Sequence, residues 1–139
     1  MTEGHEGWDD YAPFYDWENA RTLGRRDVPF WRTLALQQNC PVLELGCGTG
    51  RISVPLAKAG VSLVGIDRSE AMLARARQRI KRGRLTSRAR LLRGDIRALP
   101  FRPATFPLVM APYGVLQSLL RERDLAVTLN AVGRVLKRG

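Results

Sequence analysis

A chain of 139 residues, 45% of them hydrophobic, is long enough to bury one core and too short for two ordinary domains, which excludes a disordered chain. No apolar run approaches the ~20 residues of a membrane span, and the N-terminus lacks the basic-then-apolar layout of a signal peptide. The net charge of +10 leaves acidic partners open, and we expect an ordered, cytoplasmic domain whose two cysteines, Cys40 and Cys47, stay reduced.

Helices and strands alternate along the chain. An aromatic N-terminal segment, residues 1–38, ends in a helix that begins at Asp27 and Pro29. Short apolar runs bounded by proline, glycine or aspartate predict strands over residues 41–45, 61–66, 89–94 and 106–111.

Capping residues and helical spacing predict three further helices. The first runs from Thr49, as N-cap, to Ala59 with a mild kink at Pro55, and the second follows Ser69. The last covers residues 122–137, with an apolar face of Leu125, Leu129, Val132 and Leu136. This alternation predicts an α/β fold in which helices cover both faces of a parallel sheet.

The stretch "VLELGCGTGR", residues 42–51, places three alternating glycines behind an apolar strand and an acid. Glycine allows a tight reversal, and without a Cβ it lets a ligand approach the backbone beside a helix N-terminus. The third glycine is Gly50, and position 51 is arginine, so the dinucleotide pattern G-x-G-x-x-G is not met. A phosphate-binding Gly-Lys-Ser/Thr ending is also absent. Alternatively, the three glycines form only a turn that connects the strand to the helix and bind no ligand.

These residues resemble motif I of the class I S-adenosylmethionine-dependent methyltransferases, and later segments keep step with that family. The segments "LVGIDRSEAML", "RGDIRALPF", "FPLVMAPYGVLQSLL" and "VGRVLKRG" are similar to its next motifs, in order. The resemblance covers roughly residues 40–139. It implies a Rossmann-like sheet of order 3-2-1-4, with residues 39–139 forming the cofactor-binding core and residues 1–38 a lid.

The resemblance also implies roles for individual residues. Asp67 would hold both ribose hydroxyls of S-adenosyl-L-methionine, and Met72 would pack on its adenine. Asp95 would accept from the adenine amino group, and the amide of Ile96 would meet the ring. Glu44 would lie near the methionine ammonium. The full set of expected cofactor contacts is Tyr11, Tyr15, Glu44, Gly46, Cys47, Gly48, Asp67, Arg68, Met72, Asp95, Ile96 and Ala111.

The expected reaction is an in-line displacement at the sulfonium methyl, in which the protein aligns the reactants and excludes water. No residue is a clear base, and Tyr113 in "APYG" is only a weak candidate. Ala111 lacks the polar side chain with which the amino-methylating nucleic-acid enzymes begin this loop, so a small-molecule acceptor is favoured. No metal site is expected.

Two features leave other functions open. Arginines crowd residues 68–93, which is typical either of a solvated helix face or of a surface that binds phosphates. The family continues beyond the equivalent of Gly139 into further strands, so we expect these strands to be missing and the fourth-strand edge to be exposed. That edge could pair two copies into a homodimer. A non-catalytic cofactor-binding or RNA-binding module is therefore the alternative to an enzyme.

Overall fold

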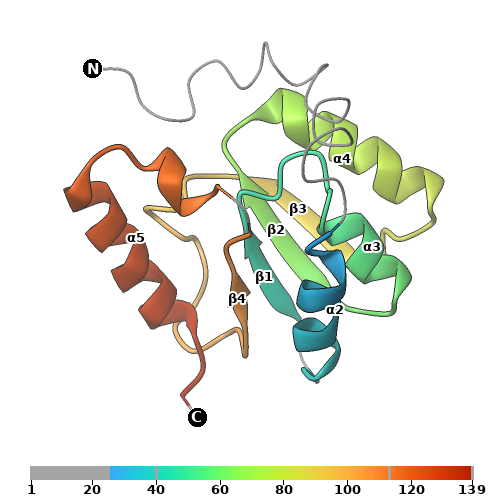
Figure 1. The fold of residues 1–139 in the computed structure, drawn as a ribbon, viewed down its shortest axis with the longest axis horizontal. Helices are drawn as coiled ribbons and strands as arrows, with labels where there is room; N and C mark the ends of the chain where they lie inside the picture. Colours follow the sequence, from blue (N-terminus) through green and yellow to red (C-terminus); the bar gives the residue numbers. More distant parts are fainter. Residues whose placement is uncertain (1–25, 40, 113, 139) are drawn as a thin grey trace.

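A four-stranded parallel sheet forms the centre of the molecule, with the strand order β3-β2-β1-β4 (Figure 1). The computed structural model describes residues 26–39, 41–112 and 114–138. The strands are β1 (Val42–Leu45), β2 (Leu63–Asp67), β3 (Ala89–Arg93) and β4 (Val109–Met110). The expected α/β fold, with its strand order 3-2-1-4, is confirmed.

Helices cover both faces of this sheet, as the alternation predicted. On one face lie α2 (Val28–Leu36), α3 (Ser53–Lys58) and α4 (Glu70–Arg82). On the other lie α5 (Glu122–Val135) and the loop between β3 and β4 (Figure 1). Successive residues of β1 serve the two sides, since Val42 packs in the first core cluster and Leu43 in the second.

The helix after the glycines begins later than predicted. Its N-cap is Ile52, so the prediction that Thr49 caps this helix is wrong. Residues between the strand and the helix form turns because three glycines there adopt positive φ angles. Pro55 lies in the first turn of this helix, and its missing N–H leaves a gap between the bond from Val54 to the carbonyl of Gly50 and the bond from Leu56 to the carbonyl of Ile52. The kink expected there stays a prediction.

The fourth strand is also shorter than the predicted 106–111. Pro107 has no amide hydrogen, and the chain pairs with different partners on its two sides. Before it, Phe106 forms an isolated parallel bridge with Leu136. After it, the carbonyl of Leu108 accepts from the amide of Leu43 at 3.0 Å, which starts the pairing with β1.

α5 turns the predicted face inward except at one position. Leu129, expected in the core, is 51% exposed. Leu125, Val132 and Leu136 are half-buried, and Thr128 and Val135 are fully buried. The buried face packs on residues of the β3–β4 loop, among them Leu99, Phe101 and Phe106, and that contact sets the rotation of the helix. In the described residues, no helix has the length and apolar character needed to cross a bilayer.

Replacing Thr128 with valine should stabilise the protein. The Thr128 hydroxyl is buried and has no hydrogen-bond partner, a condition that costs about 1–3 kcal/mol. We expect Thr128→Val to raise the free energy of unfolding by about 1 kcal/mol in urea titrations. The control is Thr33→Val on α2, where an exposed hydroxyl donates to the carbonyl of Pro29, and it should change stability little. A Thr128→Val protein less stable than the parent would contradict this assignment.

Candidate functional site

The carboxyl ends of the four strands meet at one edge of the sheet, where ligands bind in open α/β folds. The glycine turn after β1 lies there, with φ angles of +63° at Gly46, +54° at Gly48 and +85° at Gly50. A Cβ on Gly46 would lie 2.9 Å from a methyl of Val115, so that glycine is tightly covered. At Gly48 the nearest atom to such a Cβ, among the residues that the structure describes, is the Met72 methyl at 3.8 Å, so these residues leave this backbone open to a ligand.

Asp67, at the tip of β2, is fixed by two backbone amides. The amide of Gly48 donates to one carboxylate oxygen at 2.8 Å, and the amide of Ser69 donates to the other at 2.9 Å. The Ser69 hydroxyl in turn accepts from the amide of Met72 at 3.2 Å, and Ser69 caps α4 as predicted. The carboxylate therefore stands in a set orientation against the glycine turn, and its acceptor positions suit the two hydroxyls of a ribose.

Glu44 is buried beneath the turn, with 2% of its surface exposed. Its carboxyl accepts a short hydrogen bond from the hydroxyl of Ser53 in the first turn of α3. Burial raises the pKa of Glu44 to about 8, against the lowering effects of Ser53 and of the charge of Arg51. The side chain thus holds a proton at neutral pH, and a cation brought close to it would favour the ionised form.

Arg51 joins the glycine turn to α2. Its guanidinium forms a two-pronged ion pair with Asp27, at 2.5 Å and 3.0 Å, and Asp27 also accepts from the indole of Trp31 at 3.2 Å. Hydrogen bonds from Arg51 outweigh the effect of burial and hold the pKa of Asp27 below its usual range. The sequence marked Asp27 only as a helix start, and nothing in it pointed to a partner 24 residues away.

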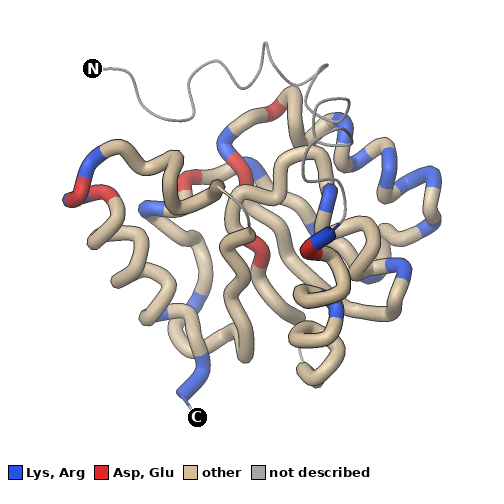
Figure 2. The backbone as a smooth tube through the Cα atoms, viewed as in Figure 1, with Lys and Arg blue, Asp and Glu red and all other residues tan. Residues whose placement is uncertain are grey.

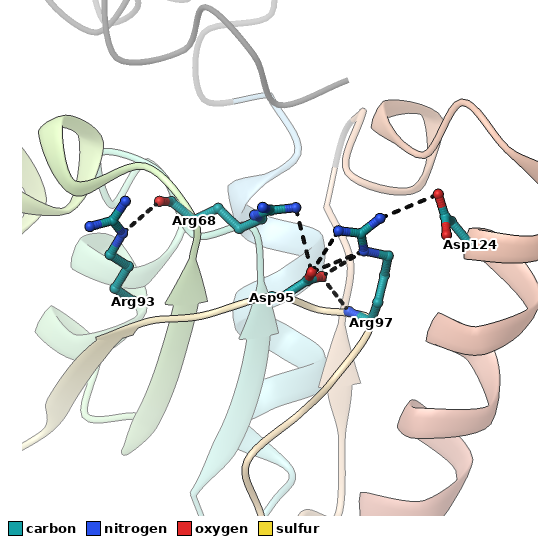
Figure 3. A network of polar contacts seen from close by, with 5 residues as sticks. All are labelled: Arg68, Arg93, Asp95, Arg97 and Asp124. Carbon is teal, nitrogen blue, oxygen red and sulfur yellow. Dashed lines mark hydrogen bonds and ion pairs between the residues drawn. The ribbon is translucent and has the colours of Figure 1, made fainter. Parts of the chain in front are cut away.

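Asp95, just beyond β3, lies within a network of arginines (Figure 3). The Arg97 side chain donates to both of its oxygens, with the shortest contact 2.7 Å, and the amide of Arg97 adds a bond of 2.8 Å. Arg68 approaches the same carboxylate at 3.4 Å. Burial alone would raise the pKa of Asp95, but these arginines hold it below its usual range. An adenine amino group would have to share this carboxylate with Arg97.

The other predicted contacts are placed as follows. The Cys47 side chain packs against Gly65 of β2, so only its backbone faces a ligand, and burial raises the pKa of its thiol well above the usual value. Met72 is buried beside Gly48, while Ile96 and Ala111 belong to the core cluster on the α5 side. Tyr11, Tyr15 and Tyr113 lie outside the described residues.

The arginine-rich segment forms an exposed basic surface. Lysine and arginine follow α4 and the turn after it (Figure 2), with exposed side chains at Arg77, Lys81, Arg82, Arg84, Arg88 and Arg90. Glu70 is bound to Arg77 at 2.7 Å. Across the described ranges, no group of three or more histidine, cysteine, aspartate or glutamate side chains is arranged to hold a metal ion.

Comparison with known proteins decides the family. Residues 42–139 match the model of a methyltransferase domain family. The chain belongs to this family. The matching segment begins with β1 and contains the glycine turn, Asp67 and Asp95, so the methyltransferase domain includes every described residue at the sheet edge except those of α2.

Two relatives and one solved structure illustrate the likeness. The chain is 37% identical to the demethylmenaquinone methyltransferase of Lactiplantibacillus plantarum, over 95% of this chain and 57% of that protein. It is 39% identical to the phosphatidylethanolamine N-methyltransferase of Cereibacter sphaeroides, over 70% of this chain and 46% of that protein. The glycopeptide N-methyltransferase MtfA complexed with sinefungin superposes with a TM-score of 0.74 at 26% identity, covering 84% of this chain and 47% of that one. The chain thus spans about half the length of the relatives it matches.

The protonated Glu44 should make stability depend on pH. Its pKa of about 8 in the folded protein exceeds the ordinary value of 4.5, so between these values the folded state holds a proton that the unfolded state has lost. Stability therefore falls as pH rises through this window, by at most about 1.4 kcal/mol per pH unit. Glu44→Gln, which mimics the protonated form, should remove this decline and be more stable than the parent above about pH 8.

Urea titrations of both proteins between about pH 5 and pH 9 measure this difference. Glu70→Gln is the matched control, because Glu70 is exposed, and that variant should follow the parent at each pH. A constant gap between Glu44→Gln and the parent would show that Glu44 is ionised throughout.

Proposed function

We propose that the chain carries the cofactor site of an S-adenosyl-L-methionine-dependent methyltransferase. Family membership supports the class, and sinefungin, found in the MtfA structure, is an analogue of this cofactor. The single observation that carries the proposal is the Asp67 carboxylate, held by the amide of Gly48 at the open part of the glycine turn. A carboxylate that can accept hydrogen bonds from a diol therefore lies beside backbone that carries no side chain, as the binding of a nucleoside requires.

In this proposal, each of three acidic residues along the sheet edge contacts a different part of the cofactor. Asp67 accepts from the ribose hydroxyls, and Asp95 with the amide of Ile96 meets the adenine. Glu44 lies beneath the glycine turn, where its buried carboxyl favours the ammonium and sulfonium charges of the methionine end. The open backbone at Gly48 lets the cofactor lie against the turn.

Bound S-adenosyl-L-methionine supplies an electrophilic methyl group on a sulfonium, which an acceptor attacks in line. The protein's work is then alignment and exclusion of water, worth ~7–11 kcal/mol when the reacting atoms are well aimed. Val115 lies over Gly46, and so the segment after β4 forms the wall beside the methionine end. Tyr113 in this segment remains the weak candidate for a base.

A small molecule is the proposed acceptor. The relatives are named for demethylmenaquinone and phosphatidylethanolamine, which share an apolar body with a small reactive head. The apolar side chain of Val115 beside the turn supports an acceptor of this kind.

Other aspects of the function stay predictions. A cytoplasmic setting agrees with the free, buried thiol of Cys47. The lid role of residues 1–38 and pairing of two copies through the β4 edge are kept as proposals. RNA binding by the α4 surface is the second function to test, and a steep loss of RNA affinity with added salt would support it.

Calorimetric titration with S-adenosylhomocysteine tests the cofactor site. The parent should bind, and Asp67→Ala should weaken binding about tenfold or more, because hydrogen bonds to a charged group contribute about 1.5–3 kcal/mol. Glu70→Ala, three residues further on and exposed, is the matched control and should bind like the parent. Binding that Asp67→Ala leaves unchanged, or an affinity for NAD equal to that for S-adenosylhomocysteine, would contradict the proposal.

Cofactor binding should also release a proton. At pH 7 the carboxyl of Glu44 is mostly protonated because its pKa is about 8, and an ammonium bound nearby lowers that pKa. Titrations in two buffers of different ionisation enthalpy should reveal up to about one proton released per cofactor, and Glu44→Gln should release none. Equal proton release by both proteins would show that Glu44 does not face the cofactor's cation.

A further inference from the structure

Two arginines fasten α5 to the loop between β3 and β4, one near each end of the helix. Near its C-terminal end, Arg134 donates to the backbone carbonyls of Leu99 and Phe101, both at 2.6 Å. In the first turn of the helix, the Asp124 carboxylate forms an ion pair with Arg97 at 3.3 Å. These two contacts add to the apolar packing of α5 on the loop and to the backbone hydrogen bonds from Thr105 and Phe106 to the carbonyl of Val135.

The two contacts differ in the other groups that each arginine binds. Arg134 reaches only backbone carbonyls, whereas Arg97 holds the Asp95 carboxylate with the rest of its guanidinium (Figure 3). The side chains of Arg97 and Asp124 are only 22% and 14% exposed, so this pair is partly shielded from solvent. One guanidinium therefore spans the distance from the end of β3 to α5.

The helix fastened in this way determines the position of the segment before it. Residues 114–121 connect the end of β4 with α5 and include the short helix η1 (Leu116–Ser118). Val115, near the start of this segment, covers Gly46. The first turn of α5 is thus one anchor of the segment that forms the wall beside the methionine end.

We propose that Arg97 is a positioning residue that couples occupancy of the nucleobase side, at Asp95, to the position of α5 and of segment 114–121. The proposal rests on the proposed function, because it needs a nucleoside at Asp95. An amino group that approaches this carboxylate displaces Arg68 first, because the Arg68 contact of 3.4 Å is the longest there. Removing that second guanidinium lessens the repulsion on Arg97, so that Arg97 binds Asp95 and Asp124 more firmly and the segment over the glycine turn is held more firmly in place.

Hydrogen exchange with and without S-adenosylhomocysteine tests this coupling. In the parent, the ligand should slow exchange of amides 114–126 by about fivefold or more, the low end of ordinary couplings between sites. Arg97→Met and Asp124→Asn should each keep the fold and reduce this ligand-dependent slowing to less than about twofold. Arg134→Met is the matched control. It should speed exchange near the C-terminal end of α5 and leave the ligand-dependent slowing at 114–126 as in the parent.

Each outcome decides the matter. Ligand-dependent slowing that survives in both Arg97→Met and Asp124→Asn overturns the proposal, and so does equal loss in Arg134→Met, which would mean that α5 only needs to be anchored. Calorimetry on the same samples distinguishes a failure of the coupling from a failure of the proposed function. A parent chain that binds no S-adenosylhomocysteine refutes the proposed function. Binding with unchanged hydrogen exchange refutes only the coupling. Should Arg97→Met fail to fold, Asp124→Asn alone gives the answer.

Discussion

The hydrogen bond from the amide of Gly48 to the carboxylate of Asp67 joins the two strand ends on which the site depends. Parallel pairing makes it feasible, because Leu45 lies beside Ile66 and the turn after β1 therefore meets the tip of β2. Positive φ angles at three glycines then direct the Gly48 amide back toward that tip. A side chain at these positions would strain the turn and, at Gly46, would collide with Val115.

Three acids lie at one edge of a small sheet, and the chain stabilises each by different means. Backbone amides hold Asp67, two arginines surround Asp95, and Glu44 takes up a proton in its buried position. These arrangements keep three carboxylates from repelling one another without a ligand. Positive charge brought to this edge would favour the ionised form of Glu44.

The segments that line this edge are held by ion pairs as much as by apolar packing. Arg51 ties α2 to the glycine turn through Asp27, and Arg97 ties α5 to the loop after β3 through Asp124. Both helices stand beside the candidate site and leave apolar residues exposed, among them Phe30 and Leu129.

Local signals in the sequence predicted the centre of the fold well. Apolar runs bounded by glycine and proline predicted the strands, and Ser69 predicted the start of the helix that it caps. Errors arose where tertiary contacts decide. Thr49 has the chemistry of an N-cap, but the glycine turns extend past it and the helix begins at Ser53. In α5, Leu129 was expected in the core and is exposed. The partners of Arg51 and Arg97 were beyond prediction, since an arginine-rich sequence offers many cations for each acid.

We propose that the glycine turn and Asp67 together bind the nucleoside of the cofactor. A crystal structure of the chain with S-adenosylhomocysteine would show whether they do. We expect both ribose hydroxyls within hydrogen-bond distance of the Asp67 carboxylate, with the ligand lying against the backbone of Gly48. A ligand bound elsewhere on the sheet edge, with no hydrogen bond from its ribose to Asp67, would refute this proposal.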